Sequence, residues 1–291
     1  MKQGFFYILL TALLFTTLEP VSKLIADQIS PLSMTFLRFL IGSLVLLPFA
    51  IAKTRKEHIR LTWQDLGIMA LLGILCICVS MLLLQYAVLL AVSPANIAII
   101  FSSNSVFTIV FAAFILKDKI TPMKLLAVGL CIAGVLVCTD FSGQTNPMSV
   151  VLAVLSALSF SLYTVLSKKF MVKYSGIIQT GFSFFFGSIA LLMVLLLMRV
   201  DIVSQIDSGN IWHLLYLGIF VSGFGYWTYF QAMHKTSAMA ASLVFFIKPI
   251  LTPFAVFLIN GIVPDYKVFL ALVLVLAGSY FGAKSPEKRP Q

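Results

Sequence analysis

Ten apolar runs, each long enough to cross a lipid bilayer, follow one another along this chain and constrain its fold more than any other feature. A helix of about 20 residues covers the roughly 30 Å hydrocarbon core of a membrane. Backbone groups inside a bilayer must pair within their own segment, so each run is expected to be helical. The runs lie near residues 4–26, 31–52, 64–89, 94–115, 122–139, 148–167, 177–198, 211–230, 237–259 and 266–283. The sequence therefore predicts an all-α integral membrane protein with ten transmembrane helices.

Composition and motifs exclude several other classes of protein. Hydrophobic residues make up 60% of the chain and charged residues only 10%, which is typical of membrane proteins. The net charge of +10 does not indicate nucleic-acid binding, because the basic residues form no patch with interleaved aromatics. The chain has no phosphate-binding glycine loop, no HExxH motif and no loop that could house a catalytic domain. We therefore expect no enzyme activity, no cofactor and no metal site.

The distribution of Lys and Arg predicts the orientation in the membrane. If the N-terminus is cytoplasmic, 15 of the 20 basic residues fall in cytoplasmic segments. Lys23, Arg199 and Lys267 fall on the opposite side, and two more lie inside spans. Positive residues favour the cytoplasmic side, so both termini are predicted to be cytoplasmic. The first run lacks a small-residue cleavage site, so we interpret it as an uncleaved span of a bacterial-type plasma-membrane protein.

The two halves of the chain resemble each other. The second run reads FLIGSLVLL from Phe39, and the seventh reads FFFGSIALL from Phe184, 145 positions later. The same offset relates Gly73 to Gly218, and an offset of 144 relates the later runs. Five spans in each half force the two copies to cross the membrane in opposite senses, which is common in secondary transporters with a site between the halves. The predicted repeats are 1–143 and 144–284, followed by a cytoplasmic tail at 285–291.

Lys248, near the middle of the ninth run, is the most informative charged residue. A lysine at that depth costs roughly 2.5–3.5 kcal/mol on insertion scales, so it is expected to face protein or water inside the bundle. Pro249 and Pro253 follow it and should loosen the helix around it. Lys248 is either part of a substrate or ion site, with these prolines as hinges, or one half of a structural ion pair.

Glu19 in the first run and Arg38 in the second are predicted to lie at similar depths, where they could pair. Such a pair would be a fixed salt bridge, or Glu19 would exchange a proton during transport while Arg38 or Lys248 holds a substrate carboxylate. Pro20 follows Glu19 and is interpreted as either a gating bend or a static kink. Glu19→Gln is expected to abolish pH-driven uptake.

Several polar side chains of other spans are weaker candidates for a substrate site. The repeat places Asn104, in the segment Ser102–Ser105, opposite Lys248, so the two could grip the ends of a polar molecule. Asn104 could instead hydrogen-bond between helices. Tyr226, Tyr229 and Tyr163 would offer polar edges to a cavity, or they belong to the core and the interfacial aromatic belts.

These features together resemble the drug/metabolite transporter superfamily, in its ten-helix EamA-type branch. In that family each half has a short turn with a glycine-acidic pair after its fourth helix and then a glycine-rich fifth helix. The corresponding segments here are LKDKITPMKLLAVGLCIAGVLV from Leu116 and INGIVPDYKVFLALVLVLAGSYF from Ile259, although Ile262 stands where an acid is usual. Pro249 matches the usual proline of the ninth helix, whereas Ser105 replaces that of the fourth. An arginine in the second helix, like Arg38, is also a feature of the family.

The resemblance implies alternating access and the export or exchange of small polar metabolites such as amino acids or organic anions, with protons as a candidate coupling ion. The lysine of the ninth helix inclines the expectation towards substrates with a carboxylate or phosphate. The main alternatives are a channel or lipid-handling protein of the same fold, and a receptor-like membrane protein without transport. A channel should show a continuous polar stripe. The sequence leaves the substrate, the direction of transport and the choice between monomer and homodimer open.

Overall fold

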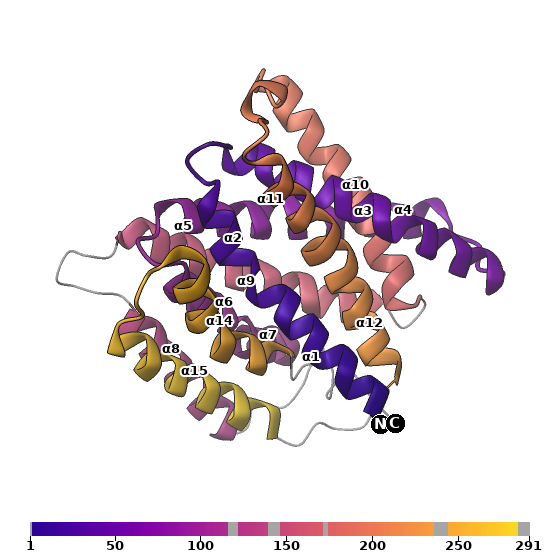
Figure 1. Cartoon of the computed structure of the whole chain (residues 1–291). Coiled ribbons are helices and arrows are strands. Elements are labelled where there is room, and N and C mark those ends of the chain that lie inside the picture. The colour runs from indigo at the N-terminus through magenta and orange to yellow at the C-terminus, as the bar shows by residue number, and fades with distance from the viewer. Residues whose placement is uncertain (1, 116–121, 139–145, 171–173, 236–243, 285–291) are drawn as a thin grey trace.

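The computed structural model describes residues 2–115, 122–138, 146–170, 174–235 and 244–284, and this part of the chain is a bundle of helices (Figure 1). In chain order the helices are α1 (Lys2–Thr16), α2 (Leu18–Leu24), α3 (Pro31–Lys56), α4 (Trp63–Gly73), η1 (Ile74–Met81), α5 (Leu82–Leu90), α6 (Pro94–Ser102), α7 (Asn104–Ile115), α8 (Pro122–Cys138), α9 (Pro147–Phe170), α10 (Gly176–Leu197), η2 (Val203–Gln205), α11 (Ile211–Leu215), η3 (Tyr216–Phe224), α12 (Gly225–Lys235), α14 (Val244–Asn260) and α15 (Tyr266–Lys284).

These helices form the ten predicted spans. Four spans consist of more than one helix: α1 with α2, α4 with η1 and α5, α6 with α7, and α11 with η3 and α12. Within the described residues, six spans are long and apolar enough to cross a membrane, and shorter apolar stretches lie in α8, α14 and α15. The first turns of the ninth predicted span, residues 237–243, lie outside the described residues. Helix α1 begins and α15 ends at the same end of the bundle, as an even number of spans requires (Figure 1).

The contacts between helices follow the internal repeat. Helix α3 of the first half packs on its counterpart α10, and α8 packs on its counterpart α15 (Figure 1). Helix α3 also contacts η3, while α10 contacts α4 and η1, which are the equivalent elements with the halves exchanged. Likewise α1 contacts α12 and α14, while α9 contacts α5 and α7. The two five-helix copies are therefore related by an inverted repeat, as predicted from the sequence.

Two equivalent residues meet where the halves join. Phe39 of α3 and Phe184 of α10 are both buried, and their rings contact edge to face with centroids 4.8 Å apart. Close backbone contacts flank this pair in both halves: Gly42 lies against Gly218, and Gly187 lies against Gly73. Small residues allow helix backbones to approach closely inside a membrane. The equal spacing of these glycines in the two halves therefore reflects two copies of one helix contact.

Gly73→Ala should destabilise the protein by about 1–3 kcal/mol, because the new methyl group would overlap the backbones of Ser183 and Gly187, which cannot easily move. The matched control is Gly67→Ala in the same span, where no atom lies within 4 Å of the added carbon. Ala favours the helix over Gly by about 1 kcal/mol, so the control should be neutral or stabilising. Unfolding in mixed micelles measures both. Equal stability of the two variants would contradict the close contact.

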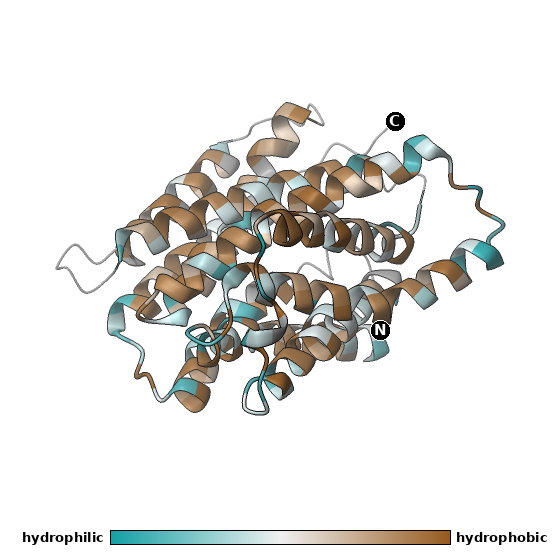
Figure 2. Cartoon of the chain, turned by 90° about the horizontal axis from the view of Figure 1, so that it is seen from above, coloured by the Kyte–Doolittle hydropathy of each residue, from teal (hydrophilic) through white to brown (hydrophobic). Residues whose placement is uncertain are grey.

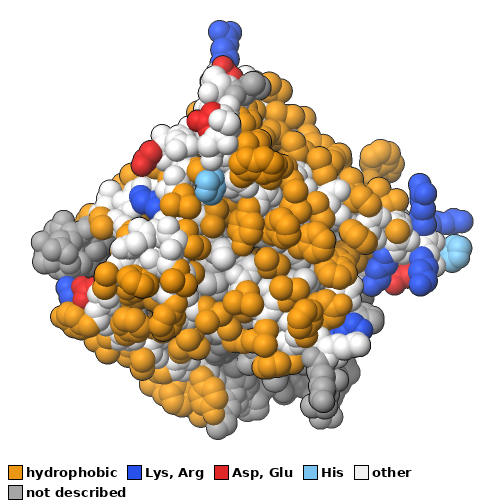
Figure 3. Space-filling model, viewed as in Figure 1, with side chains coloured by type: hydrophobic (Ala, Val, Ile, Leu, Met, Phe, Trp, Pro, Cys, Tyr) orange, Lys and Arg blue, Asp and Glu red, His pale blue; other side chains and the backbone are white. Residues whose placement is uncertain are grey.

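The surface of the bundle is largely apolar. Figure 2 shows hydrophobic residues along the helices and hydrophilic ones mainly at their ends. On the face drawn in Figure 3, hydrophobic side chains cover most of the surface and Lys and Arg lie at its margins. Phe114, Leu197 and Leu258 are 73%, 84% and 79% exposed. Apolar exposure on this scale is what lipid contact requires.

Candidate functional site

The candidate site centres on a buried ion pair between the first and ninth spans. Lys248 Nζ on α14 donates to Glu19 Oε1 on α2 at 2.6 Å. Glu19 is 0% exposed and Lys248 is 4% exposed. Lys248 therefore faces protein, as the sequence predicted, and its partner comes from the other half of the chain.

Pro20 sets the local geometry of Glu19. It has no N–H to donate, and its ring would clash with the carbonyl of Thr16 in a continuous helix. Helix α1 accordingly ends at Thr16, and α2 begins at Leu18 with Glu19 in its first turn. In the second half Val165 takes the place of Pro20, and α9 runs unbroken from Pro147 to Phe170. The predicted kink is present, and it distinguishes the half that carries the carboxylate.

The fourth span breaks at Ser103 without a proline. Ser102 Oγ donates to the Ala98 carbonyl, Ser103 Oγ to Ile100, and Asn104 Nδ2 to Phe101, at 2.6–2.8 Å. Such bonds compete with the regular helix and favour a break. The end of α6 meets the ion pair through the Phe101 ring, whose centroid is 5.5 Å from Lys248 Nζ.

In the described part of the chain no hydrogen bond joins Asn104 to Lys248, so their shared grip on a polar molecule stays a prediction. The side-chain amide of Asn104 donates to its own span, and its backbone carbonyl accepts from Ser161 Oγ at 2.7 Å. Phe101, which sequence reasoning missed, is the residue that contacts the ammonium. Phe101 lies two residues before the break at Ser103, and nothing in the sequence distinguishes it from the other 25 phenylalanines.

Arg38 on α3 is 2% exposed, and its guanidinium carbon lies 4.6 Å from the Phe39 ring centroid. It lies within electrostatic range of Tyr226 and Glu19. The expected Glu19–Arg38 bond is not formed, because Glu19 bonds to Lys248 instead. Equal depth in the membrane does not determine where two residues lie around the bundle. Helix α14 packs directly on α1 and α2, and this places Lys248 beside Glu19. Arg38 Nε and Nη2 are buried without a hydrogen-bond partner in the described part of the chain.

The three candidate tyrosines lie near this centre. Tyr226 packs its ring on Phe184, with centroids 4.8 Å apart, and Tyr229 packs on Phe245 of α14 at 5.8 Å. Tyr163 of α9 is buried near Tyr226 and Tyr229. Cys76 of η1 is also buried near Tyr226, which the sequence did not indicate. The structure thus gathers residues of α3, α9 and α12 around the join between the halves.

Pro249 and Pro253 are both buried within α14, which continues through them from Val244 to Asn260. Asn260 Nδ2 donates to the Pro20 carbonyl at 3.1 Å, so the end of the ninth span is bonded to the bend of the first. The sequence did not predict this hydrogen bond between the halves. The role of Pro249 and Pro253 as hinges stays a prediction.

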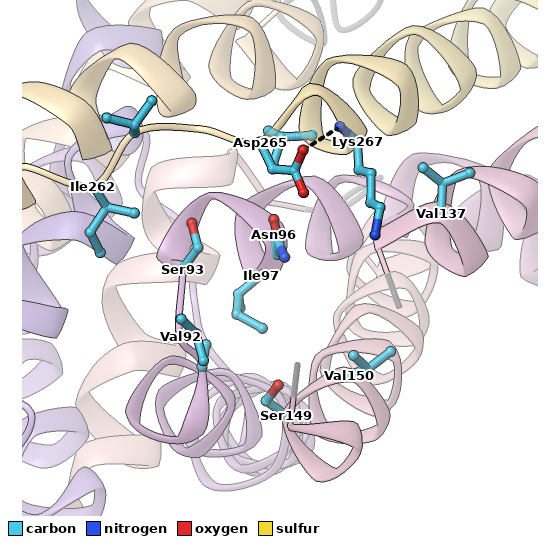
Figure 4. A pocket seen from close by; sticks show the side chains of 13 residues that line it. Val92, Ser93, Asn96, Ile97, Val137, Ser149, Val150, Ile262, Asp265 and Lys267 are labelled. Carbon is cyan, nitrogen blue, oxygen red and sulfur yellow. Dashed lines mark hydrogen bonds between the residues drawn. The ribbon is translucent and has the colours of Figure 1, made fainter. Parts of the chain in front are cut away.

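A separate cavity of about 170 Å³ opens at the end of the bundle where α5 ends and α6 begins (Figure 4). Its polar lining residues are Ser93, Asn96, Ser149, Asp265 and Lys267. Neither Glu19 nor Lys248 lines it. The ion pair is therefore enclosed by protein in this conformation and is separate from this cavity.

The comparisons with known proteins agree with this architecture. The profile of the EamA-like transporter family matches residues 2–139 and again 147–282. The chain belongs to the EamA-like transporter family. An uncharacterized transporter from Clostridium kluyveri is 38% identical over 99% of this chain and 95% of its own. Membership makes the protein a multi-pass membrane transporter and not an enzyme.

More distant EamA relatives include an S-adenosylmethionine uptake transporter from Rickettsia prowazekii, 22% identical over 98% of this chain and 94% of its own. A crystal structure with 19% sequence identity superposes with a TM-score of 0.66, covering 97% of this chain and 96% of the other. At that identity the superposition supports the ten-helix fold alone.

Proposed function

We propose that this protein is a secondary active transporter that moves small polar metabolites across the plasma membrane by alternating access. The observation that carries the proposal is the enclosed Glu19–Lys248 pair, which joins the two halves at a distance of 2.6 Å. A charge pair removed from water is weak evidence for stability, because desolvation offsets most of its attraction. Ionisable residues inside a membrane more often serve transport.

Rocking of one half against the other would separate α14 from α2, and with them the two charged groups. Separation of unpaired charges in protein is costly, so each must gain another partner in the same step. A proton can neutralise Glu19, and an anionic substrate group can accept from Lys248. Glu19 is thus proposed as the coupling residue, with Pro20, Pro249 and Pro253 as hinges that let the helices move. Asn104, Tyr226, Tyr229 and Tyr163 are proposed to line the pathway near this pair.

The experiment is flux into liposomes that contain the purified protein. Amino acids, organic anions, phosphate esters and, because of the Rickettsia relative, S-adenosylmethionine are the solutes to test. We expect saturable uptake of one class, and counterflow of labelled solute against its unlabelled form. Counterflow requires a carrier that reorients with bound substrate, so non-saturable flux without counterflow would indicate a channel. Absence of flux for every class would favour a receptor-like protein.

A further inference from the structure

The buried charges of the central site do not balance. Among the described residues, Glu19, Arg38 and Lys248 are the buried charged side chains within the spans, and Asp65 belongs to a helix cap at the end of α4. Glu19 and Lys248 neutralise each other. Arg38 therefore leaves one positive charge inside the bundle, only 2% exposed. A buried cation without a counter-charge is strongly unfavourable, and in a membrane protein it marks a pathway or a ligand site.

The contacts of Arg38 do not compensate for this charge. The Phe39 ring lies 4.6 Å from the guanidinium carbon, and such a cation–π contact contributes about 0.5–2 kcal/mol. The effective desolvation penalty of one buried ion is several kcal/mol. Tyr226 and Glu19 lie within electrostatic range, yet neither is hydrogen-bonded to Arg38. Glu19 keeps its second oxygen, Oε2, buried without a partner as well.

The two unpartnered nitrogens of Arg38 have a specific geometry. Nε–H and one Nη2–H point in the same direction from one edge of the planar guanidinium. That edge presents two parallel donors, which match the two oxygens of a carboxylate in a bidentate pair. A lysine or an amide could not present the same pair of donors. That edge is therefore complementary to a planar anion in the direction of its donors as well as in charge.

We infer that Arg38 binds the carboxylate of a monoanionic substrate, so that the class of solute carried is an organic monocarboxylate. One negative charge makes the site neutral while the Glu19–Lys248 pair stays intact. A zwitterion would leave the net charge of the site at +1. An uncharged solute would also leave it at +1, even where a carbonyl oxygen accepts from one of the donors. This inference rests on the proposed transport function for its physiological meaning, and it specifies the substrate class of that site.

Equilibrium binding to the purified full-length protein tests the inference. The probes are two matched sets: lactate, lactamide and alanine, and the larger phenyllactate, phenyllactamide and phenylalanine, with inorganic phosphate in addition. We expect one carboxylate or both to bind and to raise the melting temperature, with weaker effects of their amides and zwitterions. Equal binding of all three members of a set, binding of phosphate in preference, or no binding of either carboxylate would overturn the inference.

Arg38→Met provides the second readout. It should weaken carboxylate binding by at least about 30-fold, the effect of removing one partner of a buried charge pair. The same variant should melt at a higher temperature than the parent when no ligand is present, because it removes an uncompensated buried charge. If Arg38 instead stabilised the fold, Arg38→Met would lower the melting temperature of the ligand-free protein. Arg55→Met, at the exposed end of the same helix, is the control and should change neither quantity.

The two proposals can fail separately. If a solute shows saturable flux and counterflow but Arg38→Met leaves its binding unchanged, the carboxylate site is refuted and the proposed transport function stands. Binding of carboxylates at Arg38 without flux of any solute would keep the site and refute transport.

Discussion

Lys248→Met should destabilise the folded protein by about 3–5 kcal/mol, because it leaves Glu19 buried without a counter-charge. Glu19 is 0% exposed. In the described part of the chain, the only hydrogen bond of its side chain is the one that Lys248 donates. Met keeps most of the volume of the lysine stem, so the loss reports the charge and not a cavity. Unfolding in mixed micelles gives the free energy, and the same variant should lose flux in liposomes.

Two further variants isolate the pair. Glu19→Gln combined with Lys248→Met removes both charges and should recover most of the lost stability, since uncharged residues of similar volume often replace a buried pair without cost. Lys53→Met breaks the Lys53–Glu57 pair, which is 3.7 Å long with side chains 29% and 44% exposed. Exposed pairs contribute about 0–1 kcal/mol, so this control should change little. An undiminished loss in the double variant would mean that packing, and not charge, holds Lys248.

The sequence predicted those features that depend on local composition. Ten spans follow from apolar length, and Lys248 was expected to face protein or water because lipid cannot solvate an ammonium. The inverted repeat was visible because Phe39, Gly42 and their counterparts occupy one shared contact, which constrains both copies equally. Pro20 likewise predicted a break in the helix, because the proline ring clashes with the carbonyl of the residue four places before it.

The partner of Glu19 could not be predicted in the same way. Depth along a helix is a local quantity, whereas position around the bundle depends on how all spans pack. The same holds for the π-helical segments η1 and η3, which occupy equivalent places in the third and eighth spans. In a π-helix each hydrogen bond spans five residues, whereas in an α-helix it spans four, and hydropathy does not register this difference. Ser102–Asn104 could have indicated a break, because serine and asparagine bond to preceding carbonyls.

Glu19→Gln should abolish accumulation driven by a pH gradient while counterflow continues. The amide can still accept a hydrogen bond from Lys248, so the contact between α2 and α14 is kept. The Lys248 ammonium loses its counter-charge, so the variant should also be less stable than the parent. The amide cannot take up or release a proton, so the separation of the pair no longer depends on pH. Exchange of labelled for unlabelled solute moves no net proton and therefore needs no change at this residue. The measurement compares uptake with and without an imposed gradient, alongside counterflow at symmetrical pH.

The control for this variant is Glu57→Gln, which removes the carboxylate of an exposed pair and should leave both activities at the level of the parent. If Glu19→Gln still accumulates solute in response to the gradient, Glu19 is not the coupling residue and its bond to Lys248 is structural. If both activities disappear in a variant that folds normally, the carboxylate is needed for substrate binding or for closing the halves. The proposal that a proton separates Glu19 from Lys248 is supported only if the gradient response is lost and counterflow is intact. That combination shows that proton coupling is lost while the helices still move.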